Sequence, residues 1–139
     1  MRWKLWTVAI LLGLNSACSP CDNTEVSRLA SPDGQLEAVI FERSCGATTD
    51  FSTQISIVRK GSSLAGGAGN TFIADSNHGA APRAKWGGPP ADLKWLTNRS
   101  LGVSIHPATR IFVRQTTVSI RSGIMSREQV AVDYAQTLQ

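Results

Sequence analysis

The chain has few of the residues on which most binding and catalytic sites depend. It holds two histidines, three cysteines and one tyrosine, and Phe, Trp and Tyr together make up 6% of its residues. Nucleic-acid binding uses a clustered basic surface, usually with aromatic residues for stacking, and the sequence has no long basic run. We therefore expect no nucleic-acid partner. With so few imidazoles and thiols, we also expect no metal and no cofactor.

The formal net charge of +4, from 14 Lys and Arg against 10 Asp and Glu, overstates how basic the folded part is. Two of the 14 basic residues, Arg2 and Lys4, lie in the first 17 residues. That segment has the layout of a secretory signal, with the two charges followed by the apolar run 5–14 and then by small residues. The run is shorter than the roughly 20 residues that a transmembrane helix needs. We predict a helical signal peptide over residues 1–17 and export, with a retained anchor as the alternative.

The residues before Cys18 resemble a bacterial lipobox, the motif in which a cysteine is lipidated and becomes the mature N-terminus. Ser16 and Ala17 carry the resemblance together with the cysteine, whereas Asn15 stands where Leu is usual. The resemblance implies a lipid at Cys18 and, because Ser19 follows, sorting to the outer membrane. Membrane contact would then be limited to this lipid or to the signal segment. The expected location is the periplasm or the outer membrane.

The cysteines fit the oxidising environment that an exported chain meets. If Cys18 carries lipid, Cys21 and Cys45 are left to form a disulfide, which would stabilise the fold by about 3 kcal/mol. The alternative is Cys45 as a nucleophile, which requires a nearby base that lowers the pKa of its thiol. Both candidate bases, His78 and His106, lie far from it along the chain. We therefore favour the disulfide.

Alternation of apolar and polar residues predicts an all-β fold. The turn residues of 31–34 precede a strand over 35–41, and a second strand over 51–58 completes an antiparallel hairpin. A second hairpin is expected from strands 93–96 and 101–106. Between them, the glycine-rich segment 61–69 leads into a strand rather than a helix, which argues against a phosphate-binding loop.

The C-terminal part continues the pattern. Residues 110–121 read as one strand whose apolar face changes, which predicts a bulge near Gln115. A last strand is expected over 130–134, with a short helix beginning at Ser126 as the alternative. About seven or eight short antiparallel strands would form a sandwich or a strongly twisted sheet.

The expected organisation is simple. Residues 1–17 form the signal peptide, 18–30 an N-terminal tail and first strand, and 31–139 a single β-rich domain.

Two resemblances to known proteins accompany this reading. The turn at 31–34 with its strand, and the segment 93–103, resemble half-blades of β-propellers, but two such units cannot close a propeller of four or more blades. A longer resemblance, carried by 41–43, 45–49 and 69–82, is to small exported bacterial proteins of uncharacterised function. It implies one exported β-rich domain and no activity, cofactor or catalytic residue.

The strongest candidate site lies within residues 70–82, where Asp75, Asn77 and His78 fall within four positions. The simplest explanation is an Asx-type turn that ends a strand. Loops on a rigid β scaffold often carry recognition, so we predict a binding surface here. A metal or acid–base site would need further groups, and His106 is the candidate for one.

We therefore predict a non-catalytic module of the cell envelope that binds an unknown envelope protein or polymer. One alternative is a small exported hydrolase that uses His78 with Asp75, or Cys45. Another is a purely structural envelope protein. Convergence of Asp75, His78 and His106 in one concave pocket would favour the hydrolase.

Overall fold

The computed structural model describes residues 21–46, 50–64 and 66–137, which form nine strands and no helix. The predicted signal peptide and Cys18 lie outside the described residues. Within them, no helix qualifies as a membrane span. The expected all-β fold is confirmed. In chain order the strands are β1 (Asp22–Ala30), β2 (Leu36–Ser44), β3 (Ser52–Arg59), β4 (Phe72–Asp75), β5 (Ala91–Thr97), β6 (Ser100–Ile105), β7 (Arg110–Arg114), β8 (Thr117–Arg121) and β9 (Arg127–Gln136).

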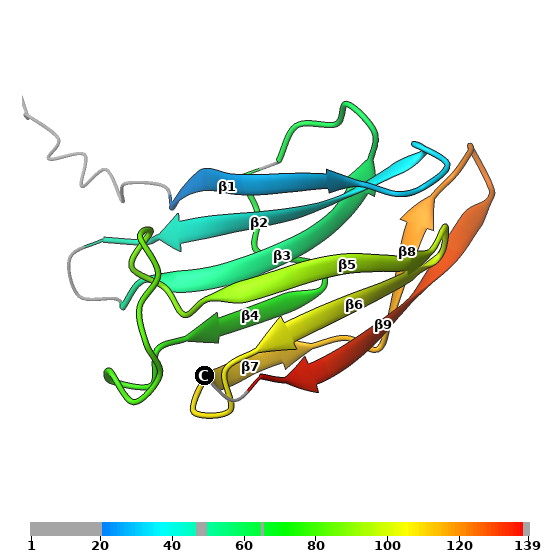
Figure 1. The fold of residues 1–139 in the computed structure, drawn as a ribbon. Helices are drawn as coiled ribbons and strands as arrows, with labels where there is room; N and C mark the ends of the chain where they lie inside the picture. Colours follow the sequence, from blue (N-terminus) through cyan, green and yellow to red (C-terminus); the bar gives the residue numbers. More distant parts are fainter. Residues whose placement is uncertain (1–20, 47–49, 65, 138–139) are drawn as a thin grey trace, which may run out of the picture.

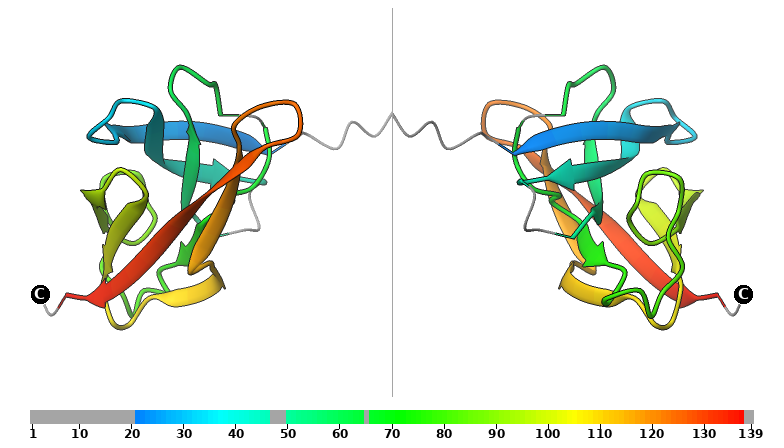
Figure 2. Two further views of the ribbon diagram at one scale, coloured as in Figure 1. Left: turned by 90° about the vertical axis from the view of Figure 1, so that its right-hand side faces the viewer. Right: turned by 90° about the vertical axis from the view of Figure 1, so that its left-hand side faces the viewer.

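The strands form two sheets, with the orders β1-β2-β3-β4-β7 and β5-β6-β9-β8 (Figure 1). The end-on views of Figure 2 show the two sheets as layers that face each other. All neighbouring strands are antiparallel except β6 and β9, which are parallel. The prediction of a purely antiparallel arrangement is therefore wrong for one pair. After β6 the chain crosses to the first sheet as β7 and returns to the second sheet as β8. β9, which forms a hairpin with β8, therefore lies beside β6 and runs in the same direction as β6.

The inner faces of both sheets share one hydrophobic core. Alternate residues of each strand point into it, as the period of two requires. Each fully buried Val, Leu, Ile or Phe side chain contributes roughly 1.5–3 kcal/mol to the stability of the fold. The most deeply buried members include Leu36, Ala38, Ile55, Ile57, Phe72, Leu101, Val103 and Val130. β2 is also covered on its other face, where Val39 and Phe41 are almost completely buried.

The turn before β2 forms as its residues predict. The backbone N–H of Gly34 donates to the carbonyl of Ser31 at 2.8 Å, and Gly34 has a φ of 68° that glycine adopts without strain. The hydroxyl of Ser31 donates to Asp33 Oδ1 at 2.7 Å. This turn fixes the register in which β1 pairs with β2, so residues 22–30 are part of the five-stranded sheet.

Residues 110–121 do not form the single bulged strand that the sequence suggests. β7 pairs with β4 in the first sheet, whereas β8 pairs with β9 in the second. The change of face interpreted as a bulge near Gln115 is the point where the chain passes between the sheets. There the N–H of Gln115 donates to the carbonyl of Thr71 at 2.9 Å. β9 begins at Arg127 as a strand, so the alternative helix from Ser126 does not form.

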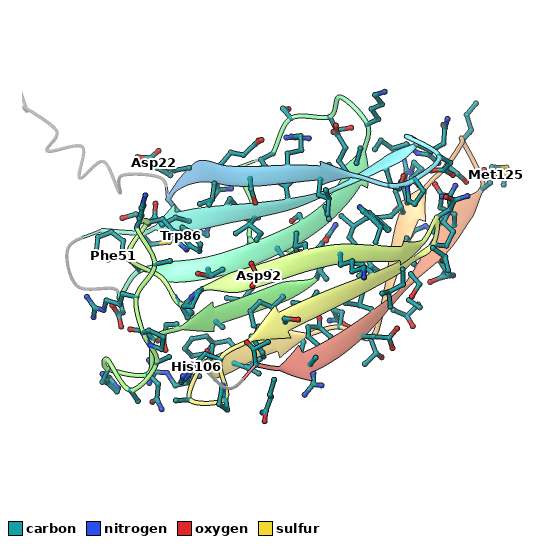
Figure 3. All side chains as sticks on the ribbon, viewed as in Figure 1. Asp22, Phe51, Trp86, Asp92, His106 and Met125 are labelled. Atoms are coloured by element: carbon teal, nitrogen blue, oxygen red, sulfur yellow. A yellow bond between two sulfur atoms is a disulfide. The ribbon has the colours of Figure 1, made fainter. Side chains whose placement is uncertain are left out.

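Two tryptophans join parts of the sandwich that are distant in sequence. Trp86 packs against the core from the loop between β4 and β5, and its Nε1 donates to Thr53 Oγ1 at 2.8 Å. Trp95 on β5 also packs against the core, and its Nε1 donates to the carbonyl of Leu29 on β1 at 3.0 Å. Figure 3 shows Trp86 at one end of the sandwich and the exposed Met125 at the other.

Candidate functional site

The register of the five-stranded sheet aligns four polar residues in one row across its outer face. Arg43 on β2 lies opposite Ser52 on β3, Ser52 lies opposite Asp75 on β4, and Asp75 lies opposite Arg110 on β7. Neighbouring strands are about 4.8 Å apart, so the row spans about 14 Å. We call these four residues the polar row.

The polar row lines an open depression of about 740 Å³. Its residues come from four strands and from the two loops that follow β2 and β4, so segments far apart in the sequence build it. The remaining lining residues are Cys45, Asp50, Gln54, His78, Arg83 and Phe112.

Asp75 is 4% exposed, and its charge is matched inside the protein. Its Oδ1 accepts hydrogen bonds from the Asn77 N–H at 2.8 Å and from Arg110 Nε at 3.0 Å. Its Oδ2 pairs with Arg110 Nη2. Burial raises the pKa of Asp75, but the hydrogen bonds from Arg110 and Asn77 lower that pKa by more, so it lies below its usual value. The carboxylate is therefore ionised, and the pairing in turn raises the pKa of Arg110.

The turn after Asp75 is the expected Asx-type turn, and it holds two non-glycine residues in a left-handed conformation. Asn77 and His78 have φ values of 52° and 54°. Asn and His tolerate this region better than most residues, but glycine adopts it without cost. The exposed His78 places its Nε2 3.2 Å from Arg110 Nη1, so both Asp75 and His78 contact the Arg110 guanidinium, and Asn77 holds the Asp75 carboxylate through its backbone N–H.

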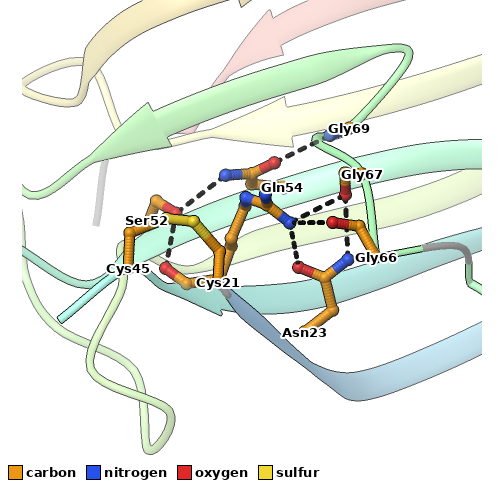
Figure 4. Close-up of a disulfide and its surroundings, with 9 residues drawn as sticks. Cys21, Asn23, Cys45, Ser52, Gln54, Gly66, Gly67 and Gly69 are labelled. Carbon is orange, nitrogen blue, oxygen red and sulfur yellow. Dashed lines mark hydrogen bonds between the residues drawn. A yellow bond between two sulfur atoms is a disulfide. The ribbon is translucent and has the colours of Figure 1, made fainter. Parts of the chain in front are cut away.

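Arg43, at the other end of the row, is held by uncharged groups. Its Nη1 donates to Asn23 Oδ1 at 2.7 Å and to the carbonyls of Gly66 and Gly67 at 2.9 and 3.0 Å. Figure 4 shows the Cys21–Cys45 disulfide nearby, which joins the start of β1 to the end of β2. The sequence prediction named this pair. Its position beside Arg43 ties the edge strand to the wall of the depression.

Asp50 joins the two loops that line the depression, the loop after β2 and the loop after β4. Its Oδ1 accepts hydrogen bonds from the Phe51 N–H at 3.0 Å and from Arg83 Nη2 at 3.2 Å, and its Oδ2 accepts one from Ser76 Oγ at 3.2 Å. The Arg83 side chain is 51% exposed, so this ion pair is weak. Several modest polar interactions therefore help to position the two loops.

A β-bulge places an aromatic ring at the rim. The pairing of β4 with β7 shifts between Ile73 and Ala74, whose partners are Val113 and Ile111, and Phe112 is left without a partner strand residue. Bulges of this kind redirect a side chain. Phe112 is 57% exposed, and the guanidinium carbon of Arg110 lies 5.0 Å from its ring centroid. The depression thus combines arginines with an exposed apolar surface.

The arrangement that would favour a hydrolase is not formed. Asp75 and His78 line the depression, but His106 lines a separate small hollow, where its Nδ1 accepts a hydrogen bond from the Ala108 N–H at 3.1 Å. Cys45 is paired with Cys21. In the described part of the chain, no group of His, Cys, Asp and Glu could hold a metal ion.

Sequence reasoning found the Asp75 cluster but missed Arg43, Arg110 and Phe112. Arg43 and Arg110 lie at or near strand ends and Phe112 lies at a bulge, and a charged or aromatic residue has no distinctive local pattern at such positions. The alternation of side chains along β2 was the one available signal, because it places Arg43 on the same outer face as Val39 and Phe41. No family model, curated protein or solved structure matches the chain.

Proposed function

We propose that the protein is an exported, non-catalytic binding module of the cell envelope, whose ligand site is the depression around the polar row. The observation that carries the proposal is the position of this row. Strand register fixes four polar side chains on an outer sheet face, beside an exposed ring and an open volume of about 740 Å³. Ligand sites are typically concave and preformed, with a few polar groups that fix orientation.

The conformation of His78 supports this location. A glycine would make the same turn without steric cost, yet the chain places an imidazole there and directs it toward Arg110. Unfavourable backbone conformations often occur at functional sites. The imidazole contributes little to the core because it is exposed, so contact with a ligand gives it a role that folding does not.

Export belongs to the proposal. The disulfide is compatible with an oxidising compartment, and the signal-like segment 1–17 gives a route to one. Lipidation at Cys18 and membership of a family of small exported bacterial proteins are proposed on their sequence resemblances. The partner would be an envelope protein or polymer.

The test is capture from envelope extract by the tagged mature chain, with mass spectrometry of protein and polymer fractions. His78→Ala removes a depression side chain, and His106→Ala is the matched control because it removes the other histidine from a separate hollow. We expect the wild type and His106→Ala to retain the same material and His78→Ala to lose it. Equal capture by all three proteins would contradict the proposal.

A further inference from the structure

The hydrogen-bonding capacity left free in the depression is mainly that of donors. Both carboxylates are engaged, Asp75 by Arg110 and Asn77, and Asp50 by Arg83 and other donors. A guanidinium has five N–H donors. Among the residues that the structure describes, Arg43 donates hydrogen bonds only through its Nη1. The N–H groups of its Nε and Nη2 can therefore donate to a ligand.

The side chains that line the depression also carry a net positive charge. Three arginines face two aspartates there. Arg110 pairs with Asp75 and Arg83 pairs with Asp50, so these two pairs carry no net charge. Arg43 has only uncharged partners among the described residues. The depression therefore carries a positive charge that no described carboxylate balances.

Building on the proposed function, we propose that the depression binds an oxyanion, the carboxylate or phosphate group of an acidic sugar in an envelope polymer. Arg43 supplies the charge and the free N–H groups, in the fork geometry that suits carboxylate and phosphate oxygens. Ser52 lies beside it in the polar row, and the Asp75 pairing fixes Arg110 beyond. The exposed Phe112 ring offers an apolar surface to the sugar.

The experiment is a titration of the isotope-labelled mature chain, followed by NMR of backbone amides and of arginine Nε–H groups. The probes are glucuronic acid for a carboxylate, glucose 6-phosphate and inorganic phosphate for a phosphate, and glucose as the neutral control. Both sugar acids, or one of them, should shift the signals of Arg43, Ser52 and His78 at millimolar concentration, and glucose should not. Added sodium chloride should weaken the effect.

Arg43→Gln should weaken binding about tenfold or more, the loss expected for a charge-assisted hydrogen bond. Arg121→Gln is the matched control, because it removes the same charge from an exposed position on β8 in the other sheet. Since Arg43 also holds the loop carbonyls, Ser52→Asp is a second variant. It adds a negative charge beside Arg43, keeps the arginine and should abolish anion binding.

The inference is overturned if neither sugar acid shifts these signals, or if Arg121→Gln weakens binding as much as Arg43→Gln does. Binding of inorganic phosphate alone, with no response to either sugar acid, would also overturn it. If capture from envelope extract still depends on His78 in those cases, the binding function stands and only the anionic ligand is wrong. If capture is independent of His78, the proposed function fails as well.

Discussion

Asp75 and Arg110 are direct cross-strand partners, and their side chains also pair through two N–H···O contacts on the outer face of the five-stranded sheet. The Arg110 guanidinium is therefore positioned both by the strand register and by its pairing with Asp75. It also contacts His78 and lies over the Phe112 ring. Because the Asp75 carboxylate is buried and engaged, we infer that it positions Arg110 and does not itself contact the ligand.

The first prediction concerns acid stability. The pKa of Asp75 lies below its ordinary 3.8, because hydrogen bonds from Arg110 and Asn77 outweigh the opposing effect of burial. Its ionisation thus contributes stability that is complete above the unfolded pKa and is lost as pH falls through the folded pKa. Asp75→Asn should unfold more easily than the wild type near pH 7, and the difference should shrink on acidification. Urea denaturation across this pH range measures it, and a pH-independent difference would count against the pairing.

Glu42 gives a prediction of opposite sign. It lies on the core-facing side of β2, is 8% exposed, and its Oε1 has no hydrogen-bond partner among the described residues. Burial, and then the nearby charge of Asp22, raise the pKa of Glu42 above 4.5. Its stabilising contribution is complete below the unfolded pKa and is lost as pH rises through the folded pKa. Glu42→Gln should therefore raise the melting temperature near pH 7 and have little effect well below pH 4.5.

The control for Glu42 is Glu25→Gln. Hydrogen bonds from Arg28 lower the pKa of Glu25, so this variant removes a carboxylate that is favoured in the folded state. It should give no gain in melting temperature near pH 7. A gain of equal size in both variants would show a general effect of net charge.

A third prediction separates backbone strain from function at His78. Glycine adopts its φ of 54° without steric cost, whereas alanine does not. His78→Gly should be more stable than His78→Ala by about 1 kcal/mol, and both should lose the ligand. Chemical denaturation gives the difference in free energy of unfolding. A His78→Ala protein as stable as His78→Gly would show that the turn relaxes without the imidazole.

The fourth prediction concerns the disulfide. Cys21 and Cys45 are 24 residues apart, and closing a loop of this length should stabilise the fold by about 3 kcal/mol. The double variant Cys21→Ala, Cys45→Ala should lose about this amount in urea denaturation. Peptide mapping without reductant should recover the linked pair. A free thiol at Cys45 in exported protein would contradict the pairing and return the nucleophile hypothesis.

The fifth prediction is cleavage before Cys18 on export. The intact mass of protein purified from cells that export it should show that residues 1–17 are absent. An added acyl mass would establish lipidation, whereas cleavage without it would leave a soluble exported form. A mature protein that keeps Met1 would refute the signal peptide.

Local chemistry accounts for what could be predicted. The turn 31–34, the hairpin of β2 and β3 and the hairpin of β5 and β6 each depend on residues close in sequence, and all three form. The pairing of Cys21 with Cys45 was predicted from the expected oxidising compartment and from the small number of cysteines, since lipid at Cys18 would leave only these two. Asp75, Asn77 and His78 were found together because a turn brings neighbours together.

Long-range register accounts for what could not be predicted. Arg110 reaches Asp75 only because β7 pairs with β4 across the intervening hairpin of β5 and β6, and no local pattern encodes that pairing. For the same reason the continuous strand-like character of 110–121 gave no sign that its halves belong to different sheets. Arg43 on β2 joins the site through β3 and β4, because β2 lies three strands away from β7 in the sheet.

The parallel pairing of β6 with β9 also sets the order in which the molecule can assemble. β9 is the last strand in the sequence, yet it lies in the interior of its sheet, between β6 and β8. During synthesis, β5, β6 and β8 emerge before β9, and Leu101, Val103 and Val118 stay exposed to water. Contacts of such long sequence separation form late and slowly. These side chains therefore stay uncovered until β9 is released, and a chain ending before Arg127 should aggregate.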